Sequence, residues 1–187
     1  MKAISAIGAM GIAVMLLLPA GQLAAQINDK HPKVDDNLSR TVHHQLQSLP
    51  YYSVFDYLSY TIDGSKVTLS GQVVRPTLKE HAEAAVKSIE GVLSVVNNIE
   101  VLPKSPPDDE LRRDVYRAIF EDSALKLYAV EPLPTIHIIV KNGIVTLEGT
   151  ANSKADKDLA DAKARGVQGV QGLANHLLVR DKQSAAK

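Results

Sequence analysis

The sequence of 187 residues contains no cysteine. Without thiols the chain cannot form a disulfide, use a cysteine nucleophile or carry a lipid on a cysteine. Tryptophan is also absent, and only six tyrosines and two phenylalanines are present. Because aromatic side chains are so scarce, a place where several of them cluster is a candidate contact surface.

Net charge is absent as well, since 21 basic residues balance 21 acidic residues. A nucleic-acid partner is therefore not expected, because such binding draws on a strongly basic surface. His43 and His44 are adjacent and point about 100° apart on a helix, so they are not spaced as metal ligands. No nucleophile motif or acid–base pair stands out either. We therefore predict no catalytic residue, no metal and no cofactor.

The first residues resemble an export signal. Lys2 precedes an uncharged apolar run over 3–20, and small residues follow up to Ala25. This pattern predicts a Sec-type signal over 1–25, cleaved after Ala25, and a periplasmic location. An uncleaved membrane anchor is the alternative, because the apolar run approaches the length of a membrane span.

The rest of the chain contains an internal repeat. Residues 62–71 recur as 140–149, and residues 91–101 recur as 169–179, so that Gly149 lies 78 positions after Gly71. A duplication of this kind predicts two small domains of similar fold. We place them at 36–102 and 108–180, with a proline-rich linker over 103–107.

Each copy is predicted to begin with a helix followed by a hairpin. Apolar residues at four-residue spacing, such as Leu38, Val42 and Leu46, indicate the helix. Alternating Leu58, Tyr60 and Ile62 indicate the first strand, with Tyr60 pointing inward. Asp63-Gly64 and Asn142-Gly143 are typical hairpin turns, and Ser65 is interpreted as one extra turn residue in the first copy.

A second helix and a last strand complete each copy. Gly91 and Gly169 are predicted to stop the second helices, because glycine adopts the left-handed conformation easily. The order helix, strand, strand, helix, strand predicts an α+β fold, with a three-stranded sheet and both helices on one of its faces.

The repeated residues resemble the BON domain family, named after bacterial OsmY and nodulation proteins. The resemblance rests on Asp/Asn-Gly, then Val-Thr-Leu-x-Gly, then Gly-Val-x-x-Val-x-Asn-x-Ile/Leu-x-Val, and it covers both copies. The overall layout is similar to that of OsmY-type periplasmic proteins with two such domains. This resemblance implies a non-enzymatic envelope module that binds phospholipid surfaces or other envelope components.

Two groups of residues are candidate lipid contacts. Lys154, Lys157, Lys163 and Arg165 are predicted on the second helix of copy two, where a row of cations can meet anionic headgroups. Acidic residues are interleaved with them, so an ordinary solvated helix face is the alternative. Tyr51 and Tyr52 precede the first strand and are the second candidate group. Arg112, Arg113 and Arg117 form another basic group, which acidic residues surround.

The leading functional hypothesis is an exported protein that binds anionic phospholipid surfaces and supports envelope integrity or tolerance of osmotic stress. The rival is an adaptor or chaperone-like factor for envelope proteins, since exposed strand edges can accept a partner strand. Positions that differ between the copies, such as Leu78 and its counterpart Asp156, are interpreted as outward-facing and therefore as the place to look for function.

Overall fold

The computed structural model describes residues 36–129 and 134–180, so the predicted export signal lies outside the described residues. Both copies of the repeat belong to one compact unit, His31–Lys187. None of the helices in the described ranges has the length and apolar character needed to cross a membrane.

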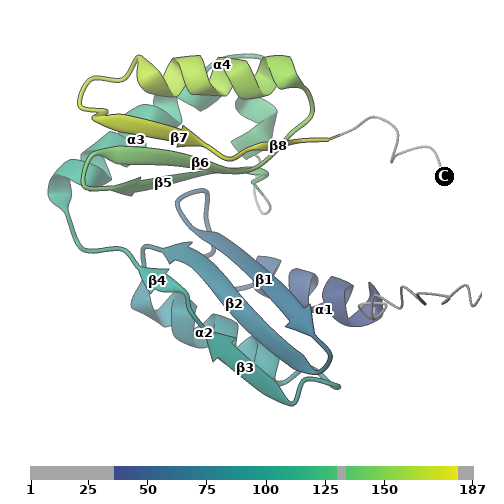
Figure 1. The fold of residues 1–187 in the computed structure, drawn as a ribbon. Coiled ribbons are helices and arrows are strands. Elements are labelled where there is room, and N and C mark those ends of the chain that lie inside the picture. Colours follow the sequence, from purple (N-terminus) through teal and green to yellow (C-terminus); the bar gives the residue numbers. More distant parts are fainter. Residues whose placement is uncertain (1–35, 130–133, 181–187) are drawn as a thin grey trace, which may run out of the picture. The chain divides into compact units, whose positions relative to one another are not determined.

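The first copy consists of two helices and one small sheet (Figure 1). Its elements are α1 (Asp36–Gln47), β1 (Tyr57–Asp63), β2 (Lys66–Val73), α2 (Pro76–Lys87), β3 (Ser94–Asn97) and β4 (Glu100–Val101). β1 pairs with β2 in antiparallel orientation, whereas β3 and β4 both run parallel to β2. The predicted last strand is therefore interrupted, and β3 and β4 are its two halves.

The second copy repeats this topology and adds one element. It contains α3 (Pro106–Phe120), η1 (Lys126–Ala129), β5 (Ile136–Lys141), β6 (Ile144–Ala151), α4 (Lys154–Arg165), β7 (Gly172–Asn175) and β8 (Leu178–Val179). The 3-10 helix η1 has no counterpart in the first copy. Ser105 caps α3 by accepting a hydrogen bond from the Asp108 amide, and Pro106 and Pro107 form the first turn of that helix. The predicted α+β fold with two tandem modules is confirmed.

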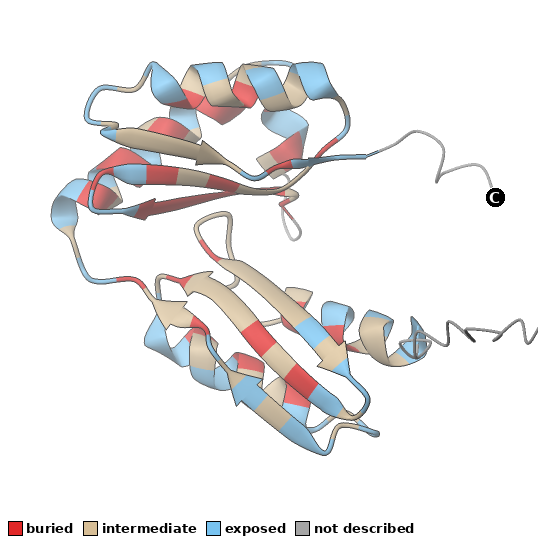
Figure 2. Cartoon of the chain, in the orientation of Figure 1, coloured by how far each residue is buried: buried red, intermediate tan, exposed pale blue. Residues whose placement is uncertain are grey.

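Each module has its own apolar core between the helices and one face of the sheet. In the first module Val42 and Leu46 of α1 pack with Val67 and Leu69 of β2. The second module has an equivalent and larger cluster, in which β5 is buried along most of its length (Figure 2). Full burial of one such side chain contributes about 1.5–3 kcal/mol. The two clusters of buried side chains therefore hold the helices on the sheet in each module.

The two hairpin turns are equal in length, and the prediction of an extra residue at Ser65 was wrong. Asp63 pairs with Lys66, and Lys141 pairs with Ile144, so two residues form each turn. Instead, the glycine occupies the first turn position in the first module, as Gly64, and the second turn position in the second module, as Gly143. In the second module both Asn142 and Gly143 have positive φ, as a type I′ turn requires, whereas in the first only Gly64 does.

Gly71 and Gly149 mark a close approach of the hairpin strands. Both have positive φ, and a Cβ atom at Gly71 would lie 2.0 Å from the carbonyl oxygen of Tyr57. A Cβ atom at Gly149 would lie 2.2 Å from the carbonyl oxygen of Thr135. The backbone therefore excludes any side chain at these two repeated positions.

Gly91 and Gly169 do not end the second helices, which corrects another expectation. α2 ends at Lys87 and α4 ends at Arg165, and the residue after each keeps a right-handed helical conformation. The glycines, with φ of 90° and 95°, lie in a following turn that the Val92 and Val170 amides close. They redirect the chain from the helix towards the last strand.

Candidate functional site

Asn97 and Asn175, which the repeat places at equivalent positions, are part of the framework. The Nδ2 group of Asn97 donates to the Lys79 carbonyl and to Glu83, both at 3.0 Å, and its Oδ1 accepts from the Ile99 amide. Asn175 makes the same three contacts in the second module. Each asparagine thus ties the interrupted last strand to the preceding helix.

The structure brings the four predicted lipid-binding cations onto α4, but each one has a partner within the chain. Lys154 pairs with Asp158 at 2.5 Å, Lys163 with Asp122 at 2.9 Å, and Arg165 with Asp161 at 2.6 Å. Lys157 donates to the Leu177 carbonyl at 2.7 Å. The hydrogen bond from Arg165 to Asp161 raises the pKa of the guanidinium.

These four cations differ in how far they are committed to the fold. Asp161, the partner of Arg165, also accepts from Asn175, so this carboxylate belongs to the framework around the last strand. Lys157 likewise binds the backbone next to β8. The Lys154 side chain is 81% exposed, that of Arg165 is 59% exposed and that of Lys163 is 40% exposed. Lys154, Lys163 and Arg165 therefore remain accessible to a ligand from solvent.

The two predicted tyrosine contacts lie in different environments. Tyr51 is 70% exposed, and the guanidinium of Arg75 lies 5.2 Å from the centre of its ring. Tyr52 is turned inward, with its ring centre 5.5 Å from that of His137. Burial raises the pKa of Tyr52, although the Leu58 amide opposes this by hydrogen bonding. Tyr51 is thus available on the surface, whereas Tyr52 takes part in internal packing.

Residues 52–57 of the first module contact β5 of the second. The Val54 carbonyl accepts a hydrogen bond of 2.8 Å from the Ile138 amide. Phe55 packs edge-on against Tyr116 of α3, and Tyr57 lies beside His137. This segment therefore covers the outer edge of β5, which explains why β5 is more buried than β1.

Asp56, a buried side chain that the sequence did not single out, holds this segment in shape. Its carboxylate accepts from the Ser53 amide and hydroxyl at 3.1 and 2.7 Å, and from the Val74 amide at 2.8 Å. Burial raises the pKa of Asp56, and these hydrogen bonds act in the opposite direction. The residue fixes the turn that presents Val54 and Phe55.

The second module satisfies the equivalent amide in a different way. The Asn152 amide, 78 residues after Val74, donates to the hydroxyl of Tyr128 at 2.9 Å. The same hydroxyl donates to Asp156 at 2.7 Å. Asp156 occupies the position of Leu78, which is 1% exposed, so this pair does not face outward as we expected. Copy two thus has a carboxylate where copy one has a buried leucine, and Tyr128 donates to that carboxylate.

A change in the repeat spacing could have revealed this insertion. The apolar positions of the first helices, such as Leu46 and Ile119, are separated by 73 residues, whereas the strands are separated by 78. Five residues are therefore inserted between helix and strand in copy two, and η1 with Tyr128 lies there. The apolar pattern predicted both helices correctly, but we did not interpret the difference between the offsets of 73 and 78 residues.

Two further buried polar side chains stabilise the second module. Asp108 accepts from the amides of Asn142 and Gly143, both at 2.9 Å. Burial opposes its ionisation, but these hydrogen bonds outweigh burial and lower the pKa of Asp108. Arg112 donates to the Val140 carbonyl at 2.6 Å and is only 3% exposed, so it does not belong to the surface group expected with Arg113 and Arg117.

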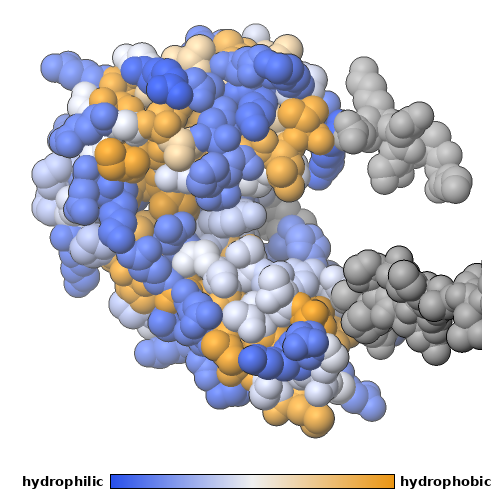
Figure 3. All heavy atoms as spheres, in the orientation of Figure 1, coloured by the Kyte–Doolittle hydropathy of each residue, from blue (hydrophilic) through white to orange (hydrophobic). Residues whose placement is uncertain are grey.

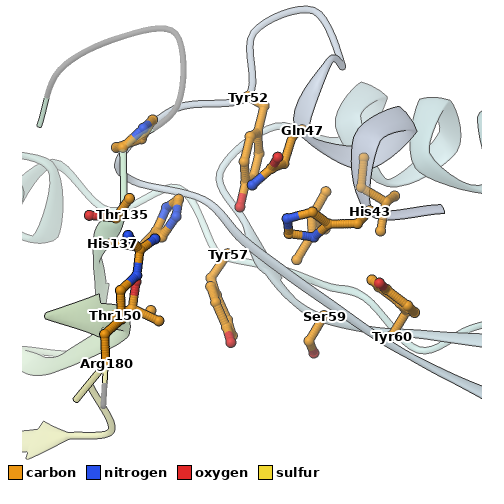
Figure 4. A pocket seen from close by; sticks show the side chains of 14 residues that line it. His43, Gln47, Tyr52, Tyr57, Ser59, Tyr60, Thr135, His137, Thr150 and Arg180 are labelled. Carbon is orange, nitrogen blue, oxygen red and sulfur yellow. The ribbon is translucent and has the colours of Figure 1, made fainter. Parts of the chain in front are cut away.

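A groove of about 390 Å³ runs along the free edge of β1, and we call it the β1 groove. Its walls include His43 and Gln47 of α1, residues 57–60 of β1, and His137 and Arg180. Figure 4 shows His43 and Tyr60 on one side, His137 and Arg180 on the other, and Tyr52 and Tyr57 between them. None of the described residues that line the groove is a carboxylate. The groove offers hydrogen bonds and aromatic contacts rather than an acid–base pair.

His137 is the most buried titratable group in the wall of this groove. Burial lowers its pKa, and the nearby carbonyl groups of Ser53, Asp56 and Pro134 offset part of that effect. Its ring is consequently neutral in the folded protein near neutral pH. Among the described residues, no three or more His, Cys, Asp or Glu side chains gather in a way that could hold a metal ion.

Exposed apolar side chains lie mainly at loops and strand edges. Leu93 is 85% exposed, Leu127 is 73% exposed, and Leu178 of β8 is 70% exposed next to the partly exposed Val179. Figure 3 shows hydrophobic areas of this kind mixed with hydrophilic surface. Single exposed leucines are common on protein surfaces. Leu178 and Val179 are consecutive on the edge strand β8, so they place one exposed apolar side chain on each of its two faces.

Comparison with solved structures gives two similar chains of CdsD, a structural protein of the type III secretion system of Chlamydia trachomatis. One is its C-terminal domain, with 12% identity, 78% of this chain and 98% of that chain covered, and a TM-score of 0.31. The other has 14% identity, with 80% and 96% covered, and the same TM-score. TM-scores this low carry no functional comparison.

Comparison with characterised proteins gives a closer relative. The chain is 31% identical over 128 residues to the osmotically-inducible protein Y of Escherichia coli strain K12. The alignment covers 64% of this chain and 60% of the relative, so the chain matches less than two thirds of that protein. The model of the BON domain matches residues 34–103 and again residues 107–181. The resemblance in the repeated residues is therefore confirmed, and this chain is a member of the BON domain family with two BON domains.

Proposed function

We propose that this chain is an exported, non-enzymatic protein of the bacterial envelope that binds phospholipid membrane surfaces and supports the envelope under osmotic stress. Membership of the BON family and the similarity to an osmotically inducible protein support this proposal. The observation that carries lipid binding is the exposure of Lys154, Lys163 and Arg165 on α4. Under this proposal the predicted signal over 1–25 directs the chain to the periplasm.

The ion pairs on α4 do not prevent lipid binding by these three cations. Exposed ion pairs contribute only about 0–1 kcal/mol, so a lipid phosphate can replace Asp158, Asp122 or Asp161 at little cost. Lys157 is a poorer candidate, because releasing it would break its hydrogen bond to the Leu177 carbonyl next to β8. We therefore restrict the predicted contacts to Lys154, Lys163 and Arg165 of α4 and to the exposed Tyr51 of the first module.

Because the chain has no net charge, the attraction depends on these local cations and weakens with salt. A flotation assay with vesicles of anionic lipid, and with vesicles of zwitterionic lipid, tests the proposal. The variant Lys154→Glu/Lys163→Glu is expected to lose most binding to anionic vesicles. The control Lys66→Glu/Lys104→Glu makes the same charge change at exposed positions outside α4 and is expected to retain it.

The rival function, an adaptor for other envelope proteins, is favoured by the apolar pair Leu178 and Val179 on the edge strand β8. If the chain is such an adaptor, it should not float with either type of vesicle, and the immobilised chain should retain a specific envelope protein. If the wild-type chain fails to float with both types of vesicle, or if the α4 variant floats as well as its control, the lipid proposal is wrong.

A further inference from the structure

The β1 groove faces the edge of a strand rather than one of its faces. Four consecutive residues of β1, at positions 57–60, line it. Successive residues of a strand point to opposite faces of the sheet, so a groove that touches four in a row must lie against the backbone edge. β1 pairs only with β2 in its sheet, so this edge is the unpaired one.

The backbone of β1 presents an open hydrogen-bonding group in this groove. Tyr60 pairs in register with Leu69, as Ile138 pairs with Leu147 in the second module. The Ile138 amide points away from β6, because it donates to Val54 outside the sheet. Equal register makes the Tyr60 amide point outward too, and no acceptor for it lies in the described part of the chain.

The second module shows what this edge accepts. The turn at residues 53–56 lies beside β5, and its Val54 carbonyl accepts from the Ile138 amide, while Phe55 packs on Tyr116 beside it. Strand addition at an edge of this kind draws its affinity from main-chain hydrogen bonds and its specificity from neighbouring side-chain contacts. The first module repeats the edge at β1, where Tyr52 already takes the Leu58 amide and the Tyr60 amide stays open next to the groove.

The chemistry of the walls selects among peptides. Arg180 is the one permanently charged side chain among the described lining residues, and its guanidinium forms no ion pair with them. The nearest carboxylate with an effect on the lining is Glu148, which acts on Tyr57 and lies 2.8 Å from His176 Nδ1. With no carboxylate in the described lining itself, Arg180 favours an acidic peptide over a basic one. Tyr57 and His137 add aromatic surface for β-branched or aromatic side chains.

We propose that the β1 groove binds an extended, acidic peptide segment of another protein by strand addition to β1. The Tyr60 amide donates to a carbonyl of the peptide, in the way that Ile138 donates to Val54. An acidic side chain of the peptide pairs with Arg180. This site is separate from α4, so it does not depend on the binding of phospholipid.

A synthetic peptide tests the proposal without any membrane. The probe is a capped nine-residue peptide of alternating valine and threonine with glutamate near each end. One control peptide carries lysine in place of glutamate, and a second has N-methylated central amides, which prevents strand pairing. Binding is followed by fluorescence anisotropy, and hydrogen exchange of the Tyr60 amide is measured by NMR with and without saturating peptide.

Matched variants separate the groove from the rest of the surface. Gln47→Trp fills the groove from α1, whereas Gln45→Trp adds the same ring at an exposed position of α1 outside it. We expect Gln47→Trp to weaken binding of the acidic peptide about tenfold and Gln45→Trp to leave it unchanged. Arg180→Glu is expected to reverse the preference between acidic and basic peptides, and Lys104→Glu to leave it unchanged.

Strand addition requires slower exchange of the Tyr60 amide when the acidic peptide is bound, together with loss of binding by the N-methylated peptide. The proposal is overturned if the acidic peptide does not bind at about 1 mM, a limit near −4 kcal/mol. Unchanged exchange at Tyr60, or equal binding by the N-methylated peptide, would also overturn it. Folding of Gln47→Trp is checked by circular dichroism, and the exchange measurement on the wild-type chain decides the question if that variant does not fold.

Discussion

Replacing Gly71 by alanine should unfold the first module at a much lower temperature. The added Cβ would lie 2.0 Å from the carbonyl oxygen of Tyr57, whereas such contacts are essentially never below 3.0 Å, so the backbone must move by about 1 Å. Alanine at a φ of +118° adds conformational strain of about 1–2 kcal/mol. Together these effects should lower the free energy of unfolding by about 3 kcal/mol or more.

Alanine substitutions at two other glycines separate the effect of conformational strain from the effect of the steric clash. Gly64 has a φ of +57° with no atom near its added Cβ, so Gly64→Ala carries the strain alone and should cost about 1 kcal/mol. Gly166 has a φ of −73° and its nearest neighbour is 3.6 Å away, so Gly166→Ala should change stability by less than about 0.5 kcal/mol. The expected order of stability is Gly166→Ala, then Gly64→Ala, then Gly71→Ala.

Differential scanning calorimetry checks this order. For a module of about 70 residues, a loss of 3 kcal/mol corresponds to a fall in Tm of about 12 °C or more. Gly149→Ala should produce the same fall in the transition of the second module, because its Cβ would meet the Thr135 carbonyl at 2.2 Å. Transitions of Gly71→Ala and Gly149→Ala within about 2 °C of wild type would refute the reasoning from close approach.

Three further predictions concern buried polar groups. Because burial lowers the pKa of His137, the unfolded chain binds a proton below about pH 6.5 that the folded chain does not, so stability should fall as the pH decreases from there. Thermal melts at pH 7.5 and 5.5 should show a smaller decrease for His137→Gln, and an equal decrease would contradict this. Tyr128→Phe leaves the Asn152 amide without its acceptor and should cost about 1–3 kcal/mol in urea unfolding, whereas Tyr51→Phe should be neutral. Asp56→Ala leaves the Ser53 and Val74 amides unpaired and should cost about 2–3 kcal/mol, compared with little for the exposed Asp63→Ala, and similar losses in both would exclude the proposed role.

The sequence predicted the fold well, because apolar periodicity and the repeat both report burial. Val67 and Leu69 were expected inside and are fully buried, and so are Val145 and Leu147. Turn details were harder to predict, since a glycine displaced by one residue looks like an insertion although the paired residues on either side are unchanged.

The candidate site could be predicted less well. Charge spacing placed four cations on one helix, and the four-residue spacing of Asp161 and Arg165 is typical of an ion pair. No sequence pattern could show that Asp161 also accepts from Asn175. The β1 groove depends on residues that are far apart in sequence, such as His43 and Arg180. A local motif cannot report such a site, because its members meet only through the tertiary fold.

The different partners of the Val74 and Asn152 amides have a consequence for the exchange of parts between the two modules. Asp156 and Tyr128 are coupled, because a change in either one removes a hydrogen-bond partner of the other. The two BON domains are therefore not interchangeable parts. A chimera with α2 in place of α4 would set Leu78 against the Tyr128 hydroxyl and leave that hydroxyl without its acceptor, even though the two backbones match.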